Sequence, residues 1–102
     1  MEYQVVVSPK AYEQILDCIS FVANVSKEAA VSLYNDIKDA INSLKSMPNR
    51  CPIVEFLKYS FGVNRGLFLK DGRYIIIFRV EGPRVLINYF ADTRKKEYSG
   101  IF

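Results

Sequence analysis

Apolar residues recur at helical spacing through two segments in the first half of the chain. In the first segment they are Tyr12, Ile15, Leu16, Ile19, Val22 and Ala23. In the second they are Ala30, Leu33, Tyr34, Ile37, Ala40, Ile41, Leu44 and Met47. This spacing predicts two amphipathic helices, over residues 9 to about 23 and about 27 to 47. Ser8-Pro9 and Ser26 are suited to begin them and Pro48 to end the second. Because the break between them is short, we expect a helical hairpin.

The remaining segments have the pattern of a β-sheet. Val- and Tyr-rich stretches predict strands over residues 2–7, 63–70, 73–80 and 84–91. Asp71-Gly72 is typical of a two-residue hairpin turn with two positive φ angles, and residues 81–83 form the next turn. Residues 48–62 are a long loop. The order β-α-α-β-β-β predicts one α+β domain over residues 1–102, with the hairpin packed on one face of a mostly antiparallel four-stranded sheet.

Both faces of the predicted strands are apolar. Strict alternation places Tyr74, Ile76 and Phe78 with Val85, Ile87 and Tyr89 on one side. Since two helices can cover one face only, the other face should carry an exposed apolar strip bordered by arginine. The strip consists of Ile75, Ile77, Leu86 and Phe90. An exposed strip of this kind indicates a binding surface for a protein partner. The alternative is that the loop at 48–62 folds over it.

Composition narrows the class of protein. The chain has 102 residues, half of them hydrophobic, enough for one core. We find no signal peptide and no apolar run approaching the roughly 20 residues of a membrane span, so we expect a cytoplasmic protein without membrane contact. With two cysteines and no histidine, we expect no metal and no cofactor.

Positive charge is concentrated in the second half of the chain. Residues 1–47 have no arginine and a net charge of −2, whereas residues 48–102 contain all six arginines and have a net charge of +5. Arginine suits contact with phosphate or carboxylate groups. The second half is therefore predicted to meet an anionic partner, either nucleic acid or an acidic protein segment. The alternative is a solvated basic face.

Motifs along nearly the whole chain resemble those of RelE/ParE toxins of bacterial type II toxin–antitoxin systems. The segments are Tyr3–Ala11, Leu44–Pro52, Arg65–Leu69, Tyr74–Val80, Arg84–Ile87 and Asp92–Tyr98. Their order and spacing are more specific than any one motif. The resemblance implies a toxin that arrests growth and is neutralised by a cognate antitoxin in a hetero-oligomer. The apolar strip defined above is then the predicted antitoxin-binding surface.

The resemblance leaves two targets open, because the family divides into two branches. RelE-like members cut messenger RNA on the ribosome, and ParE-like members poison DNA gyrase. In the cutting branch, arginines and a terminal tyrosine serve the reaction, and the matching positions here are Arg65, Arg94 and Tyr98. The arginine of the middle strand is replaced by Ile75, for which Arg73 on the same face is a substitute. The predicted catalytic set is thus Arg65, Arg73, Arg94 and Tyr98.

The chemistry of RNA cleavage explains this residue set. Attack of the 2′-oxygen on the adjacent phosphate requires cations near the phosphorane and groups that move two protons. Without histidine, Tyr98 is the proposed proton carrier, with the arginines around the phosphate. The alternative for the arginines is surface charge or structural ion pairing. A third interpretation of the whole chain is a non-toxic protein-binding module of the same fold.

Overall fold

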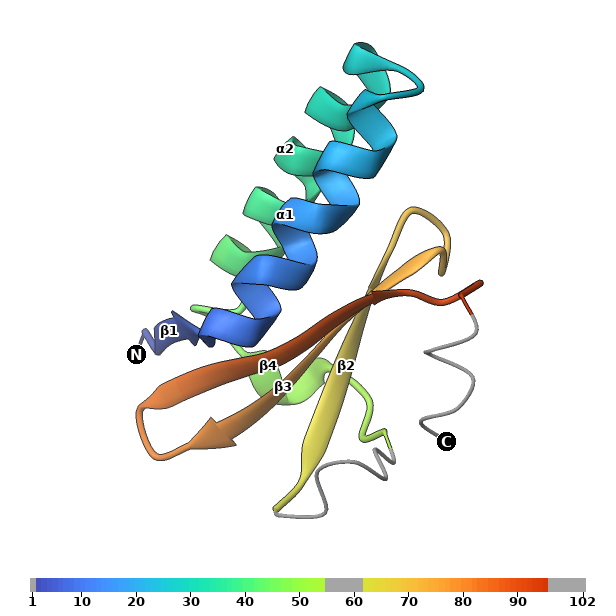
Figure 1. Cartoon of the computed structure of the whole chain (residues 1–102). Coiled ribbons are helices and arrows are strands. Elements are labelled where there is room, and N and C mark those ends of the chain that lie inside the picture. Colours follow the sequence, from blue (N-terminus) through green and yellow to red (C-terminus); the bar gives the residue numbers. More distant parts are fainter. Residues whose placement is uncertain (1, 55–61, 96–102) are drawn as a thin grey trace.

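The computed structural model describes residues 2–54 and 62–95 of the chain (Figure 1). The elements are β1 (Gln4–Val7), α1 (Pro9–Ala23), α2 (Lys27–Ser43), the 3-10 helix η1 (Pro48–Arg50), β2 (Asn64–Leu69), β3 (Tyr74–Glu81) and β4 (Arg84–Asp92). This is the predicted β-α-α-β-β-β order, and the α+β fold class is confirmed. No helix in the described ranges is long and apolar enough to cross a membrane.

The four strands form one mixed sheet in the order β1-β4-β3-β2. β1 is parallel to β4, and the other neighbours are antiparallel. The two helices form an antiparallel hairpin on one face of this sheet (Figure 1). The main core lies between the hairpin and the sheet, and its largest fully buried members include Leu44, Ile76, Phe78, Val85 and Ile87.

Serine caps begin both helices as the sequence predicts. The Ser8 side chain accepts a hydrogen bond from the Ala11 backbone N–H at 3.1 Å, and Ser26 accepts one from Ala29 at 3.1 Å. The second helix ends at Ser43, earlier than predicted. Met47 adopts a left-handed conformation with φ of 51° just before Pro48 opens η1.

A β-bulge in β4 corrects the predicted assignment of its faces. Phe78 pairs with Ile87 while its neighbour Ile77 pairs with Tyr89, which leaves Asn88 as the extra residue. Beyond a bulge, each side chain lies on the face opposite to the one strict alternation assigns. Phe90 therefore packs in the core under the helices rather than on the second face, and Tyr89 takes the place on the second face.

The second face of the sheet is also more covered than predicted. Ile75 and Ile77 are fully buried, in a small cluster with Tyr89 that Val54 packs against. The chain just before Val54 pairs with β2: Gly66 donates its backbone N–H to the Pro52 carbonyl at 3.0 Å, and Val54 donates to the Asn64 carbonyl at 2.8 Å. The prediction of an exposed strip is therefore wrong at Ile75 and Ile77. The alternative, that the loop at 48–62 folds over this face, is correct as far as Val54.

The turn between β2 and β3 is longer than the two residues predicted. Leu69 pairs with Tyr74, so four residues lie between the strands. Three of them have positive φ: Lys70 at 52°, Asp71 at 58° and Gly72 at 88°. Left-handed backbone at a lysine is uncommon, and here it places Lys70 at the corner where β2 meets the helical hairpin.

Candidate functional site

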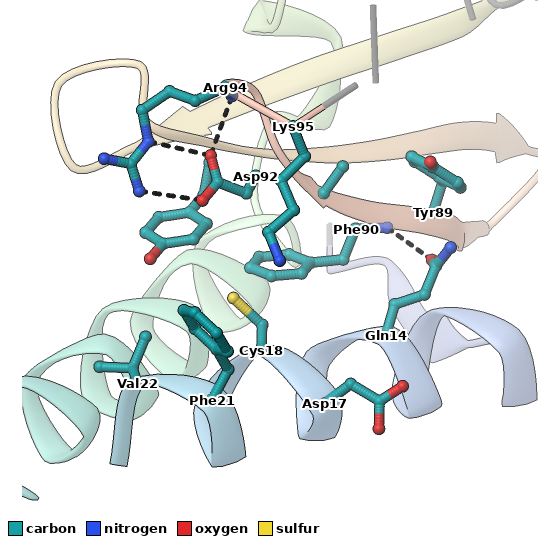
Figure 2. A pocket seen from close by; sticks show the side chains of 12 residues that line it. Gln14, Asp17, Cys18, Phe21, Val22, Tyr89, Phe90, Asp92, Arg94 and Lys95 are labelled. Carbon is teal, nitrogen blue, oxygen red and sulfur yellow. Dashed lines mark hydrogen bonds and ion pairs between the residues drawn. The ribbon is translucent and has the colours of Figure 1, made fainter. Parts of the chain in front are cut away.

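A groove opens between the helical hairpin and the sheet, at the end where β2, β3 and the residues after β4 meet. It consists of two adjoining cavities of about 220 and 370 Å³. The first lies between α1 and the end of β4 (Figure 2), and the second lies between the tip of the hairpin and the β2–β3 turn. Both are lined by Phe21, Val22, Tyr74 and Arg94. We call the two together the groove.

The groove exists because the hairpin extends past the sheet. Figure 1 shows the turn between α1 and α2 projecting beyond the strands. The apolar residues near this tip keep a large part of their surface: Phe21 is 60% exposed and Val25 is 81% exposed. Both line the second cavity. Apolar side chains left exposed beside a hollow are the usual signature of a binding surface.

Arg94 and Asp92 form a tight ion pair at the rim of the groove (Figure 2). The Arg94 guanidinium donates through Nε to Asp92 Oδ1 at 3.1 Å and through Nη2 to Oδ2 at 2.9 Å, and the Arg94 backbone N–H adds a bond of 2.9 Å. These hydrogen bonds lower the pKa of Asp92 below its ordinary value. The pair fixes the chain direction after β4 and keeps a cation at the rim, where the Arg94 side chain is mostly exposed.

Lys95 adds a second cation beside the apolar wall. Its Nζ lies 4.7 Å from the centre of the Phe21 ring, within the range of a cation–π interaction. Arg73 and Lys70 line the second cavity from the β2–β3 turn. The groove therefore has apolar walls and a rim with four cations, of which Arg94 is paired with Asp92 and Lys70 with Asp36, and the carboxylate of Asp17 also lines it.

The floor of the first cavity is built from an aromatic pair and a thiol. Tyr74 stacks on Phe90 with ring centres 5.7 Å apart, and the Cys18 thiol lines the same cavity. Burial raises the pKa of Cys18 and also the pKa of Tyr74. Since both groups are held in their neutral forms, neither is prepared as a nucleophile or a base at neutral pH.

Gln14 holds the bulged strand against the hairpin at the edge of this floor. Its side-chain oxygen accepts a hydrogen bond from the Phe90 backbone N–H at 3.0 Å (Figure 2). Phe90 is two residues past the extra residue Asn88, so Gln14 satisfies a backbone donor where the ladder is disturbed. No feature of the sequence distinguishes Gln14 for this role, because the bulge that creates it is itself not visible in the alternation pattern.

The three predicted catalytic arginines do not all come together. Arg73 and Arg94 line the same cavity. Arg65 lies near the start of β2, away from the β2–β3 turn, and donates to the carbonyl oxygens of Asn49 at 3.2 Å and Cys51 at 2.8 Å. Its guanidinium thus ties β2 to the segment after η1. Tyr98 lies outside the described residues.

Phe21, Lys70 and Lys95 are groove residues that the sequence analysis did not assign to a site. Phe21 falls just off the apolar stripe that defines α1, which is a usable signal: an aromatic residue on the polar side of a helix has a reason to be exposed. Among residues 2–54 and 62–95, no group of three or more metal-ligating side chains could hold a metal ion.

Comparison with known proteins identifies the class. The family model of the ParE toxin of the type II toxin–antitoxin system parDE matches residues 5–96. This match covers most of the chain, so the chain belongs to the ParE toxin family. The resemblance to RelE/ParE toxins is thereby confirmed, and with it the predicted class, the toxin component of a type II toxin–antitoxin system.

One similar solved structure supports the same fold. It is a chain described as the chromosomal ParDE TA system from P. aeruginosa, with a TM-score of 0.68 and 18% sequence identity. The match covers 89% of this chain and 96% of that chain. No protein of curated function matches the sequence.

Proposed function

We propose that this chain is a toxin whose groove binds an acidic and apolar segment of its cognate antitoxin, and whose target is DNA gyrase. The observation that carries the antitoxin site is the groove itself, in which exposed apolar side chains lie beside a cationic rim. Both the antitoxin and the target belong to the bacterial cytoplasm, where we expect the protein to act.

The groove supplies what a tight protein contact needs. Phe21 and Val25 are exposed apolar anchors, and aromatic anchors of this kind carry much of the energy of protein interfaces. The rim cations Arg73, Arg94 and Lys95 would attract carboxylates, which favours fast association and correct orientation. An antitoxin segment that fits must therefore alternate apolar and acidic side chains.

One of the four residues predicted to bind the antitoxin, Phe90, keeps a part in this proposal. Phe90 lines the first cavity from the helix side of the sheet, and Leu86 is half-buried on the other face. Ile75 and Ile77 have no exposed surface, so contact with them would require the segment around Val54 to move. Binding through the groove requires no such rearrangement.

The arrangement of the arginines supports gyrase rather than messenger RNA as the target. Stabilising a phosphorane requires cations around one point. Arg65 is bound to two backbone carbonyls away from the cavity that Arg73 and Arg94 share. Ile75, fully buried, stands where the cutting branch has an arginine. The match to a ParE family model points the same way.

Parallel assays of the two targets test this proposal. The chain is expressed from a tightly controlled promoter, messenger RNA ends are mapped, and the purified protein is added to gyrase with plasmid DNA. We expect gyrase-linked DNA breaks and intact messages. New ends inside translated messages that vanish in both Arg94→Ala and Tyr98→Phe would establish a nuclease instead. A chain with no growth defect and no effect on either target would be a non-toxic binding module.

A further inference from the structure

Lys70 joins the β2–β3 turn to the second helix. Its ammonium lies 2.8 Å from Asp36 Oδ2 and donates to the Ser32 hydroxyl at 2.7 Å. Ser32 and Asp36 are four residues apart on α2 and so share one face of the helix. The left-handed backbone at Lys70 and Asp71 shapes the corner from which the side chain reaches this face. The two acceptors thus hold one cation between them.

This contact spans the groove from one wall to the other. Lys70 and Ser32 both line the second cavity, one from the turn and one from the helix. The other residues on this wall are Ser26, which caps α2, and the α2 residues Ala29 and Leu33, of which only Leu33 is large and buried. Side chains as small as serine and alanine cannot reach across a cavity of about 370 Å³. Leu33 packs in the core, but at Ala29 and Ser32 packing does not bridge the two walls of the cavity.

We propose that Lys70 is a positioning residue: its contact with Ser32 and Asp36 sets the width of the groove and thereby the tightness with which the antitoxin segment is held. The inference rests on the proposed function, because it assigns a role within the same groove. If the two walls already have, in the free toxin, the separation that they have in the complex, less conformational entropy is lost when the antitoxin binds. Loss of the contact should then appear mainly as faster dissociation of the complex.

The expected effect is moderate, because partly exposed ion pairs contribute little individually. Both side chains are about one-third to one-half exposed, at 32% for Lys70 and 44% for Asp36. Removing the contact should raise the dissociation constant of the complex by a factor of roughly two to five. An effect of this size is measurable when each variant is compared with a matched control.

The test uses three variants of the full chain. Lys70→Met keeps the length of the side chain and removes its charge. The double variant Lys70→Glu with Asp36→Lys exchanges the two charges and can restore the contact. The control is Lys38→Met, which removes an exposed lysine of α2 that lines neither cavity. For each, hydrogen exchange of the backbone amides of residues 29–33 is followed in the free chain, and dissociation from the protein encoded by the neighbouring gene is measured.

We expect Lys70→Met to speed both amide exchange and dissociation, the charge exchange to restore both, and Lys38→Met to change neither. Faster dissociation with unchanged amide exchange and no rescue would mean that Lys70 contacts the partner directly, which would overturn the inference. Dissociation unchanged in Lys70→Met would overturn it as well. If the wild-type chain does not bind the neighbouring gene product at all, the proposed function fails, whatever the exchange data show for the free chain.

Discussion

The two ends of the helical hairpin place their apolar residues in different surroundings. Over the sheet, the α1 residues Ala11 and Ile15 are 0% and 7% exposed. At the tip, Phe21 and Val25 are 60% and 81% exposed. Ala11 and Ile15 lie on the face of α1 that the sheet covers, whereas Phe21 lies off the apolar stripe of α1 and Val25 follows the end of the helix. The residues beyond the sheet are left to line a groove for another protein.

The largest effect that separates the two ends is on stability. Ile15→Ala should lower the free energy of unfolding by about 2–5 kcal/mol, because it leaves a cavity in the core. Phe21→Ser should lower it by less than about 1 kcal/mol, because the ring is already mostly in water. Urea unfolding of the two variants measures both values. If Phe21→Ser is as destabilising as Ile15→Ala, the tip is part of the core and the comparison fails.

A smaller effect concerns the ion pair at the rim. Hydrogen bonds from Arg94 lower the pKa of Asp92, so the charged form stabilises the fold above the unfolded-state pKa of about 3.9. This contribution is lost as the pH falls through the lower folded-state pKa. Asp92→Asn should therefore be less stable than the wild type near pH 6, and the difference should shrink as the pH drops below about 4.

Thermal unfolding across this pH range measures the difference. Asp17→Asn removes one negative charge from a residue lining the same cavity and controls for net charge. A difference between Asp92→Asn and the wild type that stays constant down to acidic pH would show that the Asp92 carboxylate is not linked to folding.

Most of the fold follows from local sequence patterns. The serine caps, the apolar stripes and the Val- and Tyr-rich strands placed the helices and strands within a few residues of their observed bounds. The Asn88 bulge did not follow, because it replaces strict alternation by one extra residue that no local signal marks. That single residue exchanges the faces of Tyr89 and Phe90, and it accounts for the wrong assignment of Phe90 to the second face.

The site was harder to predict than the fold, because its parts come from distant segments. The sequence analysis predicted that Arg65, Arg73 and Arg94 surround one phosphate, and of these Arg73 and Arg94 line one cavity. The sequence did not indicate that the Arg65 guanidinium would donate hydrogen bonds to the backbone carbonyls of Asn49 and Cys51. Cover of the second face by the loop at 48–62 was only the alternative prediction, and the sequence did not single out Val54 as the residue that packs against Ile75. Both contacts depend on the path that the chain takes between η1 and β2, and no local sequence pattern predicts that path.

The most direct test of the groove compares two aromatic residues on α1. Phe21 lines the groove and is 60% exposed; Tyr12 lines neither cavity and is 58% exposed. The affinity of each serine variant for the protein encoded by the neighbouring gene is measured by titration calorimetry. We predict that Phe21→Ser weakens binding roughly tenfold or more, as loss of an aromatic anchor does, and that Tyr12→Ser leaves it unchanged. Equal affinities for Phe21→Ser and the wild type would contradict the assignment of the groove as the antitoxin site.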